Sequence, residues 1–191
     1  MVEQWKPTPV PPGVVPRDIS TKKIFNLVNS KKCPSIYIET GTYRGNGVDW
    51  ALKHFEIVHS IEISERFYNP CIERYKFQYR AKLHLGDSRI KLGEILKKCN
   101  KPCFIFLDAH GDINDQGPNP LYEELQTIKN HSIKNHIILI DDLRRIGDPS
   151  DPCWSKISIN ELKDQLQKIN SKYEVLEYND MLVAILNEHK N

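Results

Sequence analysis

The chain has 191 residues, 39% of them hydrophobic and 27% charged, a balance typical of one soluble globular domain. Its net charge of +2 at pH 7 is too small to indicate nucleic-acid binding. No apolar run approaches the roughly 20 residues of a membrane-spanning helix, and the first residues lack the apolar core of a signal peptide. We therefore expect a cytoplasmic protein.

Proline is concentrated at the N-terminal end. Residues 1–16 hold five of the twelve prolines, and this density favours extended conformations and excludes a helix. We predict a proline-rich arm or tail over residues 1–16 and a single domain over residues 17–191.

The five cysteines are scattered along the chain. The Cys99-x-x-x-Cys103 spacing has no second pair that would complete a zinc site. We expect ordinary reduced cysteines, most of them buried.

Strands and helices are predicted to alternate along most of the chain. Short apolar and β-branched runs predict strands, and segments with helical periodicity predict helices. The predicted strands begin at Ile36 and then span Glu56–Glu62, Ala81–Leu85, Cys103–Leu107 and Ile137–Ile140, before a hairpin of Tyr173–Tyr178 and Met181–Leu186. The predicted helices are Val48–Phe55, Glu65–Tyr79, Asp87–Lys98, Asn119–Asn130 and about Ser158–Asn170. This alternation predicts a parallel sheet with helices on both faces.

The first predicted strand runs into a glycine-rich turn before a helix. Glycine permits positive φ and lets a ligand approach the backbone, and the helix N-terminus favours a carboxylate or phosphate. The alternative is a tight turn in which the glycines serve packing alone. The spacing differs from the G-x-G-x-x-G of NAD-binding proteins. It resembles motif I of the class I S-adenosylmethionine-dependent methyltransferases, (E/D)-x-G-x-x-x-G-x-G, through Glu39, Gly41, Gly45 and Gly47.

The resemblance covers about residues 20–187 and implies a fold and a cofactor. The implied fold is α/β, a Rossmann-like seven-stranded sheet of order 3-2-1-4-5-7-6 with strand 7 antiparallel. With S-adenosylmethionine as cofactor, Glu62 would hold the ribose, being an acid about 20 residues beyond the glycine turn. Asp87 would accept a hydrogen bond from the adenine amino group, although it is equally suited to cap a helix. The implied cofactor-binding residues are Glu39, Gly41, Thr42, Tyr43, Gly45, Gly47, Glu62, Ile63, Gly86, Asp87, Ser88 and Asp108.

Two later strands end in aspartates. Asp108 follows one strand, and Asp141 and Asp142 follow the next. Neighbouring parallel strands lie about 4.8 Å apart, so these carboxylates converge and repel each other unless a cation lies between them. Oxygen ligands suit Mg²⁺, Mn²⁺ or Ca²⁺ rather than zinc. The arrangement resembles the metal site of catechol- and macrocin-type O-methyltransferases, which implies Mg²⁺ or Mn²⁺ on Asp108, Asp141 and Asp142. The alternative is that Asp108 contacts substrate while the aspartate pair caps a loop.

The loop after Asp108 carries His110, where catechol-type enzymes have a lysine base. An imidazole suits the removal of a hydroxyl proton near neutral pH, so His110 and Asp108 are the candidate catalytic residues. A purely structural histidine is the alternative. Arg144 and Arg145 are suited either to an acidic group of the substrate or to pairing with loop acids.

The main functional hypothesis is metal-assisted O-methylation of a small polyhydroxy or sugar-like acceptor. Two alternatives stay open: a metal-free methyltransferase acting on nitrogen or on a macromolecule, and a protein that binds S-adenosylmethionine without turnover. Neither nucleic acid nor a membrane is indicated as a partner, and the sequence does not determine the oligomeric state.

Overall fold

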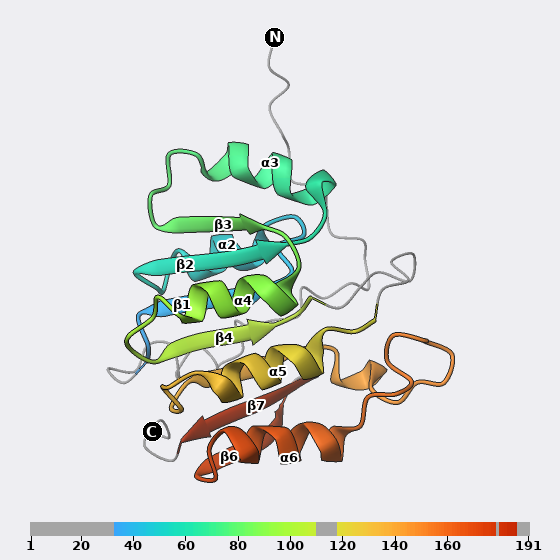
Figure 1. The fold of residues 1–191 in the computed structure, drawn as a ribbon. Coiled ribbons are helices and arrows are strands. Elements are labelled where there is room, and N and C mark those ends of the chain that lie inside the picture. The colour runs from blue at the N-terminus through green and yellow to red at the C-terminus, as the bar shows by residue number, and fades with distance from the viewer. Residues whose placement is uncertain (1–32, 110–117, 179, 187–191) are drawn as a thin grey trace.

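The computed structural model describes residues 33–109, 118–178 and 180–186. In this part of the chain seven strands form one sheet with helices on both faces (Figure 1). The strands are β1 (Ile36–Thr40), β2 (Ile57–Glu62), β3 (Ala81–Leu85), β4 (Cys103–Leu107), β5 (Ile137–Ile140), β6 (Tyr173–Tyr178) and β7 (Met181–Leu186). The helices are α2 (Asn46–Ala51), α3 (Glu65–Tyr75), α4 (Ser88–Leu96), α5 (Leu121–Asn130) and α6 (Ile159–Ile169), and a 3₁₀ helix, η1 (Leu143–Arg145), follows β5. The predicted proline-rich segment 1–16 lies outside the described residues.

The strand order is β3-β2-β1-β4-β5-β7-β6, which confirms the predicted topology. Strands β1 to β5 run parallel, and β7 is antiparallel to both β5 and β6. The order of the strands reverses between β1 and β4, which makes their carboxyl ends the place where open α/β sheets bind ligands. Because Thr40 pairs with Leu107 in register, the residues that follow β1 and β4 lie side by side at this edge.

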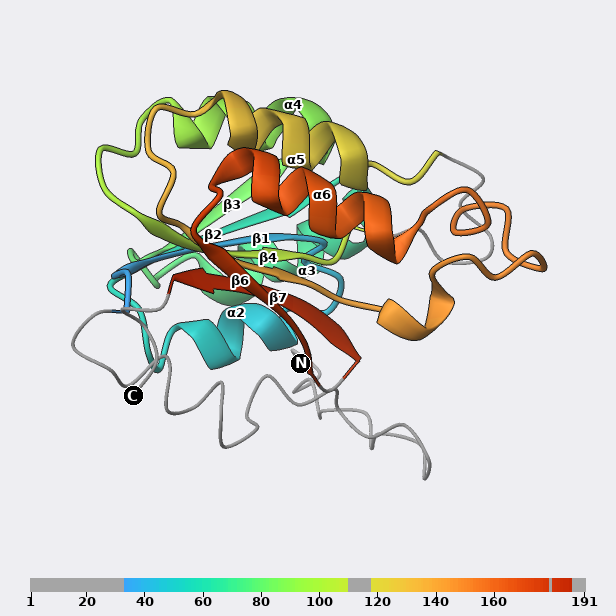
Figure 2. The same ribbon diagram turned by 90° about the horizontal axis from the view of Figure 1, so that it is seen from below.

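The core is divided between the two faces of the sheet. Every residue of β1 and β4 is buried, and successive side chains enter opposite faces. Helices α4, α5 and α6 cover one face, and α2 and α3 cover the other (Figure 2). On the second face Tyr37, Phe55 and Phe104 form an aromatic cluster with ring centroids 5.1 to 5.8 Å apart. A slip of one residue would exchange the two buried sets of side chains, so this packing fixes the register of the strand tips.

Two helices end four residues earlier than predicted, and α4 ends two residues earlier, at Leu96. Helix α2 ends at Ala51 rather than Phe55, because the chain tightens into turns there while the Phe55 side chain still packs into the core. Helix α3 ends at Tyr75 rather than Tyr79. Beyond Tyr75 there is no apolar face to bury: Phe77 and Tyr79 are 90% and 80% exposed.

In the part of the chain that the structure describes, every helix is too short or too polar to cross a membrane. All five cysteines are free thiols in this structure. Only Cys71 and Cys103 are buried, whereas Cys33, Cys99 and Cys153 are half-buried, so the expectation that most of them are buried was wrong.

Candidate functional site

The glycine turn between β1 and α2 is packed tightly at the carboxyl edge of the sheet. Gly41 has a φ of +90°, and a Cβ at this position would overlap the backbone oxygen of Asp108. Gly45 has a φ of +79° and precedes α2. A Cβ at Gly47 would overlap the carboxylate of Glu39. Close packing therefore requires glycine at 41 and 47. The backbone of the turn lies in contact with the residues at the ends of β1 and β4.

Glu39, at the end of β1, is buried beneath this turn. Its carboxylate accepts hydrogen bonds from the hydroxyls of Tyr37 (2.9 Å) and Ser60 (2.6 Å). Burial raises the pKa of Glu39 to about 7, although both hydrogen bonds favour the charged form. Thr42 extends the network through Ser60 (2.5 Å). Glu39 thus joins β1, β2 and the glycine turn in one polar cluster.

Glu62, at the end of β2, also holds the turn. One carboxylate oxygen accepts the backbone N–H of Tyr43 (2.8 Å) and the other that of Ser64 (2.9 Å). The first bond supports the unusual φ of +46° at Tyr43. Each oxygen keeps a second lone pair, so the ribose contact predicted for Glu62 stays chemically open. Ile63, the next predicted cofactor contact, is 64% exposed.

Strand β3 leads through Gly86 into Asp87 and Ser88. Asp87 accepts the backbone N–H of Arg89 (2.9 Å), which confirms its predicted role as a helix cap, and both of its oxygens bind the Arg89 guanidinium. These side-chain hydrogen bonds lower the pKa of Asp87. Arg89 would therefore compete with an adenine amino group for this carboxylate, and the predicted adenine contact stays a prediction.

A second buried glutamate, Glu124 of α5, was missed in the sequence. It is fully buried beside the hydroxyls of Thr40 and Ser88, at the end of β1 and the start of α4. These hydroxyls favour its charged form, but neither carboxylate oxygen has a hydrogen bond of good geometry in the described structure. Burial raises the pKa of Glu124 to about 7. Its helical spacing from Leu121 and Ile128, which are also buried, was the available signal.

The buried state of Glu124 predicts a pH-dependent stability. The pKa of Glu124 in the folded protein, about 7, lies above the ordinary value of 4.5. Between these two pH values the folded protein therefore holds a proton on Glu124 that the unfolded chain has released. Stability from this group is therefore present at low pH and is lost as the pH rises towards 7, by about 3 kcal/mol. In urea unfolding, the stability of Glu124→Gln relative to wild type should rise by about 2.5 kcal/mol between pH 5 and pH 8. Glu123→Gln, the exposed neighbour, should show a flat difference; a flat difference for Glu124→Gln would contradict its buried state.

The predicted aspartates lie at the tips of β4 and β5. Burial and the charges of Asp141 and Glu39 raise the pKa of Asp108 well above its ordinary value. Burial, with the charge of Asp180 added, raises the pKa of Asp141 to about 7. The backbone N–H of Asp141 donates to the Leu107 carbonyl (3.1 Å), which fixes β5 against the end of β4. His110, the predicted base, lies outside the described residues.

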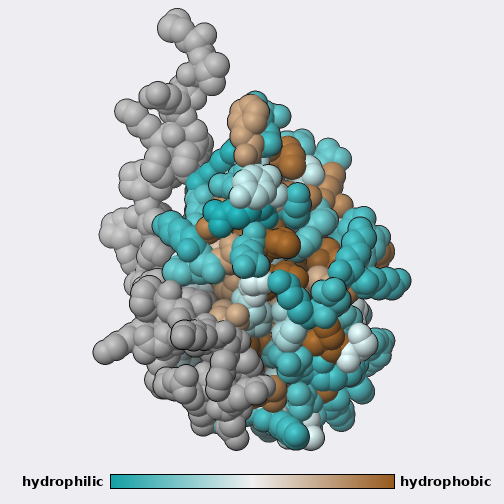
Figure 3. All heavy atoms as spheres, turned by 90° about the vertical axis from the view of Figure 1, so that its left-hand side faces the viewer, coloured by the Kyte–Doolittle hydropathy of each residue, from teal (hydrophilic) through white to brown (hydrophobic). Residues whose placement is uncertain are grey.

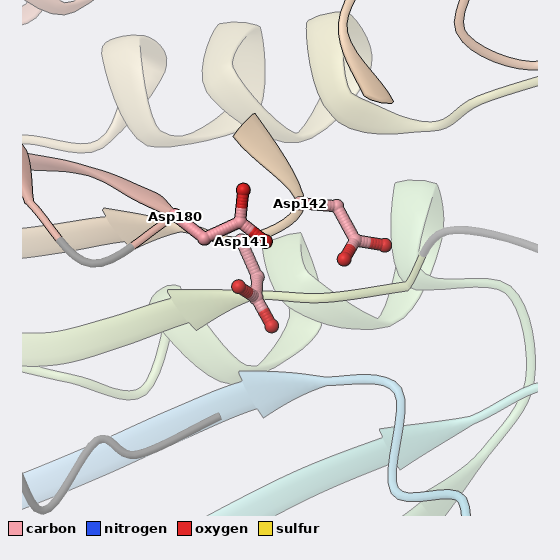
Figure 4. Close-up of side chains that lie close together, drawn as sticks. All are labelled: Asp141, Asp142 and Asp180. Atoms are coloured by element: carbon pink, nitrogen blue, oxygen red, sulfur yellow. The ribbon is translucent and has the colours of Figure 1, made fainter. Parts of the chain in front are cut away.

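Asp180 joins this group without having been predicted. It precedes β7, whose start returns to the edge where β5 ends because the two strands are antiparallel. Carboxylate oxygens of Asp141, Asp142 and Asp180 lie within 4.8 Å of one another. Figure 4 shows the Asp141 carboxylate turned towards β4, with Asp180 and Asp142 on either side. Asp108 does not belong to this closely spaced group, although the charge of Asp141 acts on it. The predicted adjacency of strands 5 and 7 was the signal that could have located Asp180.

Arg144 and Arg145 pair with acids, which is the second of the two predicted roles. Arg144 contacts Asp142 (3.1 Å) and Asp180. Arg145 contacts Asp142 (3.2 Å) and Asp151 (2.6 Å). Asp142, with a φ of +63°, is thus held in place by two arginines.

Negative charge accumulates at the tips of β1, β4 and β5. Burial raises the pKa of each of four carboxyl groups there, and a nearby cation would relieve their repulsion. The donors are oxygens, which suits Mg²⁺ or Mn²⁺, and an organic cation is equally suited electrostatically. The four residues are Glu39, Asp108, Glu124 and Asp141.

No protein-family model matches the chain, and no curated protein matches its sequence. Solved structures do match. An O-methyltransferase from Bacillus cereus, solved with S-adenosylhomocysteine (SAH), has a TM-score of 0.61 at 21% identity, over 86% of this chain and 80% of that one. The SAH-bound methyltransferase PaMTH1 from Podospora anserina has a TM-score of 0.57 at 17% identity, over 86% of this chain and 76% of that one. The chain has the class I methyltransferase fold.

A further match to this methyltransferase fold is the MycE methyltransferase of the mycinamycin pathway, solved with Mg and SAH. Its TM-score is 0.55 at 14% identity, over 83% of this chain and 46% of that one. Similarity at this level of identity establishes the fold alone. Within the methyltransferase fold, the glycine turn and the acidic strand tips stand at the ligand-binding edge of the sheet.

Proposed function

We propose that the chain is an S-adenosylmethionine-dependent methyltransferase that O-methylates a small polyhydroxy or sugar-like acceptor with the help of a divalent metal ion. The observation that carries this proposal is the convergence of Glu39, Asp108 and Asp141, all with raised pKa, at the ligand-binding edge of a methyltransferase sheet. A sulfonium donor and a divalent ion are both cations that such a site favours. Matching structures solved with SAH, and in one case with Mg, support the proposal.

The glycine turn and Glu62 are proposed to hold the methyl donor. Because Gly41 and Gly47 have no side chains, the turn packs closely against the strand ends, and a nucleoside would lie over its backbone. Glu62 would accept hydrogen bonds from the ribose hydroxyls through its remaining lone pairs. Asp87 and the backbone of Ser88 would face the adenine. S-adenosylmethionine supplies an electrophilic methyl group on its sulfonium sulfur.

The acidic strand tips are proposed to hold the metal and the acceptor. Asp108, Asp141 and Asp142 would bind a divalent ion, which supplies Lewis acidity that lowers the pKa of an acceptor hydroxyl. Arg144 and Arg145 keep Asp142 in place. His110 remains the proposed base for the acceptor proton, and the positioning of the two reactants contributes much of the rate.

Transfer of a radiolabelled methyl group from S-adenosylmethionine to a panel of catechols and sugars tests the proposal. We expect transfer with Mg²⁺ or Mn²⁺, loss of transfer with a chelator, and recovery when the ion is restored. Transfer that persists in the chelator would overturn the metal requirement and favour the metal-free alternative. Calorimetric binding of the donor without transfer to any acceptor would overturn the enzymatic proposal and favour a binding protein.

A further inference from the structure

Positive charge is concentrated in one segment of the chain. Residues 73–101, which run from the last turn of α3 to the turn before β4, hold nine lysines and arginines against three acids, a net charge of +6. The whole chain carries +2, so the remaining residues together carry −4. The small net charge of the whole chain therefore hides a strongly basic segment, and a local excess of this kind is what attracts a polyanion.

The fold brings part of this charge to one corner of the molecule. Strand β3 forms an edge of the sheet, and its Lys82 pairs in register with His59 of β2. Lys97 and Lys98 follow the end of α4, at the side of the molecule where β2 and β3 begin (Figure 1). All three lysines are exposed. Burial and the neighbouring His84 lower the pKa of His59 to about 4, and the charges of Lys82 and Lys98 add to this shift.

Two aromatic side chains project from the turn between α3 and β3, at the same side of the molecule. Phe77 is 90% exposed and Tyr79 is 80% exposed. The Gln78 N–H donates to the Tyr75 carbonyl (2.8 Å), and the Ala81 N–H donates to the Gln78 carbonyl (2.9 Å). Figure 3 views this side directly and shows hydrophobic side chains near the top, surrounded by hydrophilic surface. The two rings are therefore presented to solvent by a hydrogen-bonded turn.

Cations are interleaved with the aromatic rings along this turn. The sequence reads Lys76-Phe77-Gln78-Tyr79-Arg80-Ala81-Lys82. The Lys76 ammonium lies 5.4 Å from the centroid of the Phe77 ring. The Arg80 guanidinium donates to the Phe55 carbonyl (3.2 Å), which ties the end of the turn to the start of β2. Exposed rings on which bases stack, next to cations that contact phosphates, are the two components of a single-strand binding surface.

The charge and the shape of this corner favour nucleic acid over two other occupants. An edge strand such as β3 offers unpaired backbone groups to a second copy of the chain, but an exposed charge such as Lys82 opposes strand pairing. Two copies of the basic segment would also repel each other. An anionic membrane is attracted by the same charge, but peripheral membrane binding typically uses the apolar face of an amphipathic helix. Phe77 and Tyr79 belong instead to a short turn.

We propose that the corner formed by the α3–β3 turn, the start of β3 and the end of α4 binds single-stranded nucleic acid. Bases stack on the rings of Phe77 and Tyr79, and phosphates contact Lys82, Lys97 and Lys98. The surface lies where the parallel strands begin, at the opposite end of the strands from the glycine turn and the acidic strand tips. The proposal therefore does not rest on the proposed methyl transfer.

Fluorescence anisotropy of the full chain with labelled oligouridine and oligothymidine of about 12 nucleotides tests this proposal without any methyl donor. We expect binding whose affinity falls as the salt concentration rises. Comparison of the two oligonucleotides shows whether the surface prefers RNA or DNA. An absence of binding to both at low salt would overturn the proposal. Tighter binding to phosphatidylserine vesicles than to either oligonucleotide would also overturn it, in favour of a membrane surface.

A double aromatic variant tests the stacking. Phe77→Ala combined with Tyr79→Ala should weaken oligonucleotide binding about 30-fold, because two stacked bases lose their rings. Binding of heparin, a polyanion without bases, should stay as in wild type. Both side chains are exposed, so the free energy of unfolding in urea should change little. Wild-type affinity for the oligonucleotides in this variant would refute the role of the two rings.

A double lysine variant tests the charge. Lys82→Gln combined with Lys98→Gln should reduce the slope of log K against log salt concentration by about 1.4, because two phosphate contacts are lost. Lys168→Gln combined with Lys172→Gln is the matched control, since these exposed lysines lie at α6 and the turn before β6, far along the sheet from β3. The control should bind as wild type. An equal loss of slope in both variants would show diffuse attraction and would overturn the assigned surface.

Discussion

Replacing Asp141 with asparagine is expected to lower the kcat of methyl transfer by about 100-fold or more, which corresponds to about 3 kcal/mol of transition-state stabilisation. The Asp141 carboxylate is buried, lies near the charge of Asp108 and has a pKa raised to about 7. Asparagine keeps the shape but removes the negative charge that a divalent ion needs. Mn²⁺ binding, measured by electron paramagnetic resonance, should be lost. SAH affinity, measured by calorimetry, should change little because Glu62 and the glycine turn are intact.

Three further variants make this experiment specific. Asp164→Asn on α6, away from the strand tips, should retain both activity and Mn²⁺ binding. Asp108→Asn should lose Mn²⁺ binding, whereas Asp180→Asn should only weaken it, because Asp180 lies outside the proposed ligand set and contributes only its nearby negative charge. The reverse pattern would place the ion on Asp141, Asp142 and Asp180 and would refute the proposed ligand set. Full activity and Mn²⁺ binding in Asp141→Asn would refute the metal site altogether.

Gly41→Ala is expected to lower the free energy of unfolding by about 3 kcal/mol or more and to abolish SAH binding. An alanine would carry both the strain of a φ near +90° and an overlap with the backbone oxygen of Asp108. The Gly41 N–H also donates to the Ile61 carbonyl (2.8 Å), so the turn cannot move aside without losing its link to β2. Urea unfolding measures the stability, and calorimetry with SAH measures the binding.

Gly93→Ala is the matched control for this substitution. Gly93 lies inside α4, and an added Cβ would meet only Thr127 Cγ2 at 3.4 Å. The gain in helix propensity, up to about 1 kcal/mol, should leave the protein as stable as wild type or slightly more so. SAH binding as tight in Gly41→Ala as in Gly93→Ala would show that the turn has room for a side chain.

The strand order was predictable because it follows from short-range patterns and general rules. Apolar runs such as Cys103–Leu107 mark buried strands, helices between them require parallel neighbours, and the two-residue link after Tyr178 marks a hairpin. The placement of Asp108 and Asp141 at one edge of the sheet followed from the same rules, since the carboxyl ends of parallel strands share one edge; the grouping of Asp141 and Asp142 with Asp180 instead of Asp108 did not. These features depend on residues close in sequence, which pattern reasoning handles well.

The features that were missed depend on contacts between distant segments. Glu124 is 84 residues from Thr40 in the chain, and although its spacing from Leu121 and Ile128 matched the buried face of α5, nothing near it in the sequence indicated that it would lie against the end of β1. Asp180 enters the acidic group only because β7 folds back beside β5. The engagement of Asp87 by Arg89 depends on a side-chain conformation that sequence spacing leaves open. Burial and pKa arise from such packing, so they could not be derived from the sequence.

The central proposal is that the glycine turn and Glu62 bind the nucleoside and that Asp108 and Asp141 bind the metal ion. A crystal structure with SAH and Mn²⁺ tests it most directly, because anomalous scattering locates the metal. We predict the nucleoside over the glycine turn, its ribose hydroxyls on Glu62, and an anomalous peak at coordination distance from Asp108 and Asp141. A nucleoside bound elsewhere, or a well-occupied SAH with no anomalous peak at these aspartates, would contradict the proposal.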